Sequence, residues 1–138
     1  FTYKQWSAAF TLRAQFGNYM YNNFHSNNGS YVNFRYTGYL GNVASNVLET
    51  NWEGTDSRRY WSDYFVENAS FLRMDNLNVG YNFGNVSKYL NLRASVTVQN
   101  VFVITKYSGL DPEIASGIDN NFYPRPRIFS LNLNLDIL

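Results

Sequence analysis

The clearest pattern in the sequence lies in residues 127–138, which read RIFSLNLNLDIL. Every odd position from Phe129 to Ile137 is apolar, and every even position from Ser130 to Asp136 is polar. Successive side chains of a β-strand point to opposite faces. This period of two therefore predicts a strand with one apolar face and one polar face.

The same alternation occurs in three earlier segments, residues 2–16, 70–83 and 91–104. We expect the four strands to be antiparallel neighbours in sequence order, forming an all-β sheet. In the second segment, a continuous register would place Arg73 and Asp75 on the apolar face. Either that strand leaves the apolar layer there, or a β-bulge near Asp75 switches its faces.

The connections between these segments differ greatly in length. Residues 84–90 form a short turn, and residues 105–126 form a medium loop that carries all three prolines. Residues 17–69 form a loop so long that it predicts either a function or some structure of its own. Within it, Asn28-Gly29 predicts a turn or hairpin, and residues 43–48 predict a short helix.

The composition excludes several classes of protein. The 138 residues are 45% hydrophobic and 19% aromatic, which excludes disorder and disfavours an all-helical fold. The net charge is +1 without a run of Lys or Arg, so no nucleic-acid partner is expected. There is no cysteine, and no apolar run is long enough for a membrane-spanning helix. Alternating strands that span a membrane remain compatible with the low mean hydropathy of −0.36.

Two kinds of β-protein fit this alternation, a β-sandwich and an outer-membrane β-barrel. Strand length favours the barrel, because about fourteen residues tilted by ~40° rise roughly 35 Å, whereas a typical soluble strand has only about 5–6 residues. Four strands cannot close a barrel, so the chain would be one piece of a larger wall. The side chains expected on its outer, lipid-facing surface are Phe10, Leu12, Val96, Val98, Leu131, Leu133 and Leu135.

Several blocks of the sequence resemble the C-terminal barrel of the SusC/RagA family of TonB-dependent transporters of Bacteroidetes. The blocks occur in the order and spacing of that family. They are YFVENASFLRMDN (64–76), GYNF (80–83), VQNVFVITKYSGLDPE (98–113), GID (117–119) and YPRPR (123–127).

The resemblance implies a fold and a role. The family forms a 22-stranded transmembrane β-barrel in the bacterial outer membrane, and this chain (residues 1–138) would supply its last four strands, one long and one medium extracellular loop, and no plug or TonB box. The family imports oligosaccharides or peptides, is powered by TonB, and works beneath a SusD-like surface lipoprotein. The alternative function is that of a secreted or surface β-sandwich that binds carbohydrate.

No catalytic residues, metal site or cofactor are predicted, and the chain is not expected to be an enzyme. His25 is the only histidine, which leaves no partner for a triad or a metal cluster, and we expect it to be a solvated loop residue. Asp111 and Glu113 flank Pro112, which is typical of a charged turn.

Loop aromatics are the better candidates for binding residues, because flat rings stack on sugars or on peptide side chains. The predicted contacts with ligand or lid are Trp52, Tyr60, Trp61, Tyr107 and Tyr123. Polar-face side chains would line the barrel lumen and contact the plug or, less often, the substrate. These lumen-facing residues are Arg13, Gln15, Arg93 and Gln99.

Overall fold

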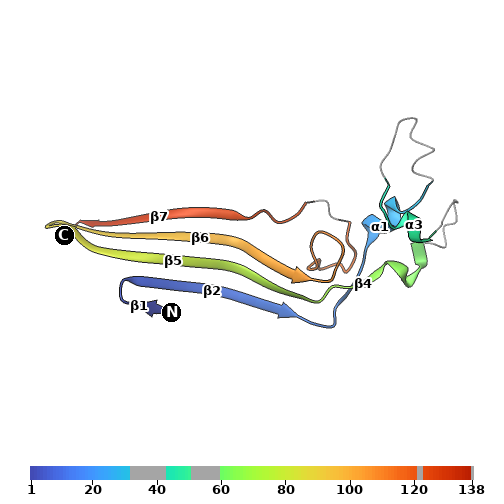
Figure 1. Cartoon of the computed structure of the whole chain (residues 1–138), viewed down its shortest axis with the longest axis horizontal. Coiled ribbons are helices and arrows are strands. Elements are labelled where there is room, and N and C mark those ends of the chain that lie inside the picture. Colours follow the sequence, from blue (N-terminus) through green and yellow to red (C-terminus); the bar gives the residue numbers. More distant parts are fainter. Residues whose placement is uncertain (32–42, 51–59, 121–122, 138) are drawn as a thin grey trace, which may run out of the picture. The chain divides into compact units, whose positions relative to one another are not determined.

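The computed structural model describes residues 1–31, 43–50, 60–120 and 123–137 (Figure 1). It divides into two units, which are described separately below. The first unit consists of residues 1–15, 71–105 and 125–138, and the second consists of residues 16–70 and 106–124.

The first unit is a single antiparallel sheet with the strand order β1-β2-β5-β6-β7. Its strands are β1 (Thr2–Tyr3), β2 (Trp6–Gln15), β5 (Phe71–Ser87), β6 (Leu90–Thr105) and β7 (Ile128–Ile137). The four longer strands lie side by side in sequence order, as the alternation predicts (Figure 1).

The strand boundaries differ from those that the sequence predicts, most clearly at two places. The expected first strand is broken at Lys4, whose φ of 52° reverses the chain, so that β1 folds back onto β2 as a hairpin. Strands β5 and β6 also extend further than expected, which shortens the turn between them from residues 84–90 to Lys88 and Tyr89. Alternation weakens near a strand end, and this explains why the pattern marks the strands but not their ends.

The register aligns the apolar positions of neighbouring strands into continuous rows across one side of the sheet. We call this side the apolar face. Three successive rows contain Trp6, Tyr81, Ala94 and Leu133; Ala8, Val79, Val96 and Leu131; and Phe10, Leu77, Val98 and Phe129. The opposite side, the polar face, carries hydrogen bonds between neighbouring strands, such as that from Asn78 Nδ2 to Thr97 Oγ1 at 2.7 Å.

A β-bulge at Asp75 resolves the two alternatives for the second segment. Thr11 pairs with Asn76 and Leu12 pairs with Met74, so Asp75 is left without a partner in the ladder. The apolar face therefore takes even positions of β5 before the bulge, such as Met74, and odd positions after it, such as Leu77. Asp75 itself meets Arg13, whose Nη2 donates to Asp75 Oδ1 at 2.9 Å.

The apolar face has no hydrophobic core beneath it within the described part of the chain. Six of the seven side chains expected on an outer surface are exposed, and Val98 is half-buried. Leu131, Leu133 and Leu135 are 68%, 61% and 59% exposed, respectively. Such a continuous exposed apolar surface is unusual for a soluble monomer and marks a surface that contacts something else.

The second unit has structure of its own inside the long loop. Strand β3 (Tyr19–Tyr21) pairs antiparallel with β4 (Val66–Asn68), and short helical segments accompany them in the described residues. A small core forms where Met20, Ala69 and Tyr107 pack together with Ile114. The helical segments are α1 (Asn23–Asn28), α3 (Val47–Thr50) and η2 (Asp63–Phe65).

Two local expectations for the long loop change accordingly. Asn28-Gly29 does not form a hairpin: Asn28 is the last residue of α1, and Gly29 follows as its C-cap. The helix expected over residues 43–48 is placed at Val47–Thr50. None of the helices in the described residues is long and apolar enough to span a membrane.

Candidate functional site

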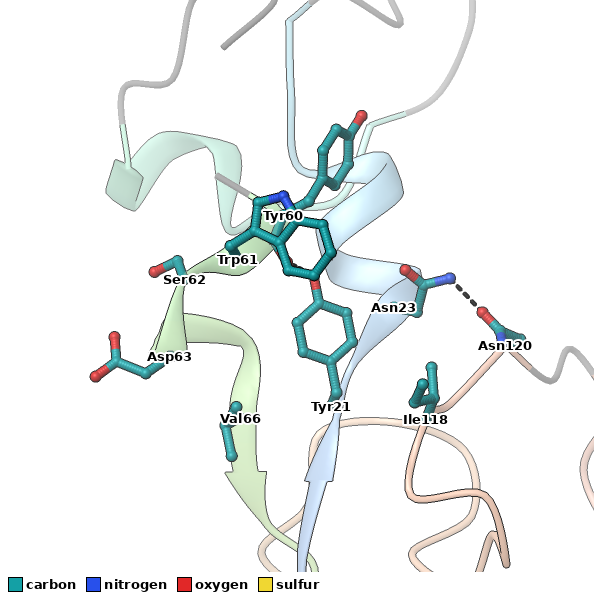
Figure 2. A pocket seen from close by; sticks show the side chains of 9 residues that line it. All are labelled: Tyr21, Asn23, Tyr60, Trp61, Ser62, Asp63, Val66, Ile118 and Asn120. Atoms are coloured by element: carbon teal, nitrogen blue, oxygen red, sulfur yellow. Dashed lines mark hydrogen bonds between the residues drawn. The ribbon is translucent and has the colours of Figure 1, made fainter. Parts of the chain in front are cut away.

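The second unit contains an open pocket of about 730 Å³ (Figure 2). Its residues come from β3, α1, residues 60–63 leading into η2, β4 and the segment 106–124. They are Tyr21, Asn23, Tyr60, Trp61, Ser62, Asp63, Val66, Ile118 and Asn120. A pocket of this size lies within the range of small-molecule sites, about 300–1,000 Å³.

Strand pairing determines which side chains reach the pocket. In β3, Met20 points into the small core and is 3% exposed, so its neighbour Tyr21 points the other way. Tyr21 pairs with Val66 of β4 and forms a parallel bridge with Ile118. The Tyr21 hydroxyl is hydrogen-bonded to the Tyr60 carbonyl oxygen at 2.7 Å, which fixes the backbone beside Trp61.

The pocket wall combines these apolar groups with polar side chains (Figure 2). The Asn23 amide donates to the Asn120 side-chain oxygen, which links α1 to the segment 106–124. Ser62 is the N-cap of η2, and its hydroxyl accepts a hydrogen bond from the Tyr64 backbone at 3.1 Å. The wall therefore offers aromatic faces beside amide, hydroxyl and carboxylate groups.

The structure separates the five aromatic residues that the sequence nominated for ligand or lid contact. Tyr60 and Trp61 both line the pocket, and Trp61 is 88% exposed. Tyr123 is also exposed, but it lies outside the pocket lining. Trp52 lies outside the described residues.

Tyr107 is a correction to that set. It is only 5% exposed, and its hydroxyl donates to Asp119 Oδ2 at 2.7 Å. Burial and the hydrogen bond to the Asp119 carboxylate raise the pKa of the Tyr107 hydroxyl above its ordinary value. A buried tyrosine bound in this way stabilises the loop core and is not available to a ligand.

His25 also differs from its expected solvated state. It lies half-buried in α1, with Nδ1 at 3.6 Å from Glu67 Oε1 and 3.2 Å from Asn22 Nδ2. Glu67 accepts hydrogen bonds from Asn22 Nδ2 at 2.9 Å, from the Ser108 backbone at 2.9 Å and from Ser108 Oγ at 2.7 Å. We call these four residues the Glu67 cluster; they join α1, β4 and the segment 106–124.

The environment of Glu67 favours its charged form. Burial acts to raise the pKa of the carboxyl group, but it is outweighed by hydrogen bonds from Ser108 and Asn22 and by attraction to His25. The pKa of Glu67 is therefore lowered from its usual value. The carboxylate thus works as a negatively charged cross-link between three segments that are distant in sequence.

This lowered pKa predicts a pH dependence of the second unit. The Glu67 cluster should contribute its full stability above the ordinary carboxyl pKa, and lose it as the pH falls through the lower folded-state pKa. We expect Glu67→Gln to reduce the free energy of unfolding of this unit by about 1–3 kcal/mol at neutral pH. Hydrogen exchange of the Ser108 amide in the full-length receptor, followed from neutral to acidic pH, measures this.

Wild type and Glu67→Gln should converge as Glu67 becomes protonated, because both then carry a neutral side chain at this position. A constant difference between them at every pH would mean that the charge of Glu67 contributes nothing to the cluster.

The described residues contain no group of three His, Asp or Glu side chains placed to hold a metal ion. Asp111 Oδ1 accepts a hydrogen bond from the Glu113 backbone at 3.0 Å, which closes a turn around Pro112. This is the Pro-containing charged turn that the sequence predicts.

All four residues nominated as lumen-facing occupy the polar face of the sheet and are exposed. Arg13 pairs with Arg73 across the strands and is hydrogen-bonded to Asp75. The other three nominated residues are Gln15, Arg93 and Gln99.

Sequence reasoning missed several residues of the site. Tyr21, Asn23, Ile118 and Asn120 come together only because β3 pairs with β4 and bridges to the segment 106–124. The short alternation of Met20 between two tyrosines was a weak signal of β3, but nothing local indicated its partners.

No family model matches the chain. The chain is 43% identical over 144 aligned residues to the TonB-dependent receptor SusC of Bacteroides thetaiotaomicron, which covers 96% of the chain and 14% of SusC. It is 32% identical over 87 residues to the TonB-dependent receptor P3 of Formosa agariphila, covering 51% of the chain and 9% of that protein. The chain therefore spans only a small part of the length of these relatives.

Solved structures show the same fold. A chain of the RagAB peptide transporter superposes with a TM-score of 0.69 at 24% identity, covering 97% of this chain and 16% of that one. In the "open-open" state of the RagAB peptide importer, the TM-score is 0.65 at 23% identity. The chain has this fold and a continuous apolar face, and its similarity to SusC extends over nearly the whole length of the chain. The chain therefore belongs to the SusC/RagA family of TonB-dependent receptors.

Proposed function

We propose that this chain is part of the barrel wall of a TonB-dependent outer-membrane importer, and that it supplies the last four strands of a 22-stranded barrel. The observation that carries the proposal is the sheet, which has one continuous exposed apolar face and one hydrogen-bonded polar face. A membrane barrel needs this combination, with lipid on the apolar side and the lumen on the polar side.

Aromatic residues support the same orientation. Near the end of the sheet that carries the β1–β2 and β5–β6 turns, the rings of Trp6 and Tyr81 lie 4.8 Å apart, and those of Tyr81 and Phe83 lie 4.7 Å apart. Aromatic girdles flank the apolar band of outer-membrane barrels. These rings would belong to one of the two girdles, and the shortness of the Lys88–Tyr89 turn assigns this end of the sheet to the periplasmic side.

The connections give the other end of the sheet its role. Gln15 pairs with Phe71 and Phe71 pairs with Thr105, so both long connections leave the sheet at the same end. Outer-membrane barrels have short periplasmic turns and long extracellular loops. We therefore assign residues 16–70 and 106–124 to the extracellular side.

The arrangement disfavours the alternative of a secreted β-sandwich. A sandwich buries its apolar face under a second sheet. The second sheet in the described residues is the β3–β4 pair of three-residue strands, which is too small to cover β2, β5, β6 and β7.

The proposed cargo is an oligosaccharide or a peptide, imported with energy from TonB and beneath a SusD-like lipoprotein. Support comes from the relatives, which are named as TonB-dependent receptors, and from RagAB, which is named as a peptide transporter. Arg13, Gln15, Arg93 and Gln99 on the polar face would contact the plug or the passing substrate.

Fractionation and uptake in the native bacterium test this proposal. The full-length receptor should appear in the outer-membrane fraction, and deletion of its gene should abolish uptake of one oligosaccharide or peptide. Uptake should also stop when TonB is deleted or when a protonophore collapses the proton gradient. A receptor found in the soluble fraction, or uptake that survives without TonB, would contradict it.

A further inference from the structure

We propose that Arg93 and Asp136 on the polar face form a docking site for an extended segment of the same receptor that lies outside this chain. The docked segment carries an acidic residue and a basic residue two positions apart. The proposal rests on the barrel assignment above and deepens it, because it names the chemistry with which the plug would meet this part of the wall. The chain covers 14% of SusC, so a receptor of that length has ample chain elsewhere to supply the segment.

The two charges lie on neighbouring strands near the β5–β6 turn. Arg93 of β6 pairs with Asn134 of β7, and Asn91 pairs with Asp136 two residues further along the same ladder. The register between β6 and β7 has no shift, so side chains two residues apart share a face. Arg93 and Asp136 are therefore diagonal neighbours, and residues in that relation lie roughly 7–8 Å apart.

Neither charge is neutralised within the sheet. The side chains of Arg93 and Asp136 are exposed, and in the described part of the chain they make no hydrogen bond or ion pair. Opposite charges elsewhere on the same face do pair, since Arg13 Nη2 donates to Asp75 Oδ1 at 2.9 Å. The buried Oδ1 atom of Asn91, which neighbours both open charges, also has no hydrogen-bond donor among the described residues. The patch thus offers a cation, an anion and an acceptor to an occupant.

The spacing of these groups favours a polypeptide in an extended conformation. Side chains two residues apart in an extended segment point the same way and lie about 6.4–6.8 Å apart, close to the diagonal separation on the sheet. An acidic side chain then meets the Arg93 guanidinium while a basic side chain meets the Asp136 carboxylate. A peptide N–H of the segment supplies the donor that Asn91 Oδ1 lacks.

A passing cargo molecule fits the patch less well. A neutral cargo leaves both charges without a counterion, and an anionic cargo is attracted by Arg93 but repelled by Asp136. A polypeptide that carries both signs satisfies the two charges together. A peptide cargo with both signs is the rival occupant, and the first experiment below separates it from a segment of the receptor.

Photo-cross-linking in the full-length receptor identifies the occupant. A benzophenone side chain replaces Asn134, which lies beside both charges, or Asn132, the next polar-face position of β7. The control carries the same label at Lys88, which is exposed in the β5–β6 turn. After irradiation of outer membranes, mass spectrometry should find either β7 label joined to a segment of the same polypeptide with acidic and basic residues two positions apart, and the Lys88 label should not capture it. Capture of a peptide cargo, of another protein or of no polypeptide by the β7 labels would overturn the proposal.

Charge reversal tests the pairing itself. In Arg93→Glu, hydrogen exchange of the captured segment should become about tenfold faster, because its acidic residue then meets a like charge. Lys88→Glu changes the net charge equally but away from the site, and should leave this exchange unchanged. The charge-swapped double variant Arg93→Asp/Asp136→Arg should not restore slow exchange, because the charges of the docked segment stay as they are. Restoration by the double variant would mean that Arg93 and Asp136 pair with each other, which contradicts docking.

Failure of this proposal differs from failure of the transport proposal. Without a docked segment, the receptor would still assemble in the outer membrane and take up its cargo through TonB. A receptor found in the soluble fraction, or uptake that survives without TonB, would instead remove the barrel on which the docking site depends.

Discussion

Arginine at Leu133 is expected to reduce the yield of folded receptor in the outer membrane sharply. Leu133 lies in the middle of β7 on the apolar face, next to Ala94 of β6, and is 61% exposed in this chain. If that face meets lipid near the bilayer centre, an arginine there costs about 2–4 kcal/mol. The measurement is the fraction of the full-length receptor that runs as a heat-modifiable, protease-resistant barrel after extraction.

The matched control is Asn132→Arg, one residue earlier in the same strand. Asn132 pairs with Ser95 on the polar face, so in the proposed barrel its replacement would face the lumen and should cost much less. Equal losses of folded receptor in the two variants would argue against a lipid face on this sheet.

Alanine at Phe65 should destabilise the second unit by about 3–5 kcal/mol, because it removes a buried aromatic side chain and leaves a cavity. Phe65 is 1% exposed, and its ring meets those of Tyr21 and Tyr64 edge-on at 5.9 and 5.2 Å. Hydrogen exchange at the backbone N–H of Asn22, which donates to the Phe65 carbonyl oxygen at 2.8 Å, should become much faster in Phe65→Ala.

Tyr64→Phe is the control for this change. The Tyr64 hydroxyl donates to Glu49 Oε2 at 2.7 Å on an exposed surface, so its loss should have a small effect. The barrel should assemble normally in both variants, because Phe65 and Tyr64 belong to the second unit. Unchanged exchange in Phe65→Ala would show that this ring does not contribute to the stability of the second unit.

Most of the sheet could be predicted from the sequence because the two faces of a strand follow from the alternation of neighbouring residues, which is a local property. The alternation in β7 and β6 defines the apolar face without knowledge of any partner. The bulge was predictable as an alternative, since Arg73 and Asp75 interrupt an otherwise apolar series. The choice between a bulge and a departing strand required the strand register, in which Thr11 pairs with Asn76 and Leu12 pairs with Met74.

The loop unit could not be predicted in the same way, because its contacts join residues that are far apart in sequence. Ser108 reaches Glu67 across 41 positions, and Asn23 reaches Asn120 across 97. The burial of Tyr107 follows from such contacts, and in sequence it looks like any other loop aromatic. The turn at Lys4 depends on a positive φ, which a lysine rarely adopts and which its residue type does not predict.

The central claim is that the apolar face of this sheet contacts lipid. A scan of β7 tests it most directly, with a nitroxide side chain placed singly at each position from 129 to 136 of the full-length receptor in lipid bilayers. Collisions with lipid-dissolved oxygen and with a water-soluble nickel chelate are then compared. Odd positions should be reached by oxygen and shielded from nickel, and even positions should show the lower ratio of oxygen to nickel. A ratio without this period of two, or nickel access at the odd positions, would contradict a lipid-facing wall.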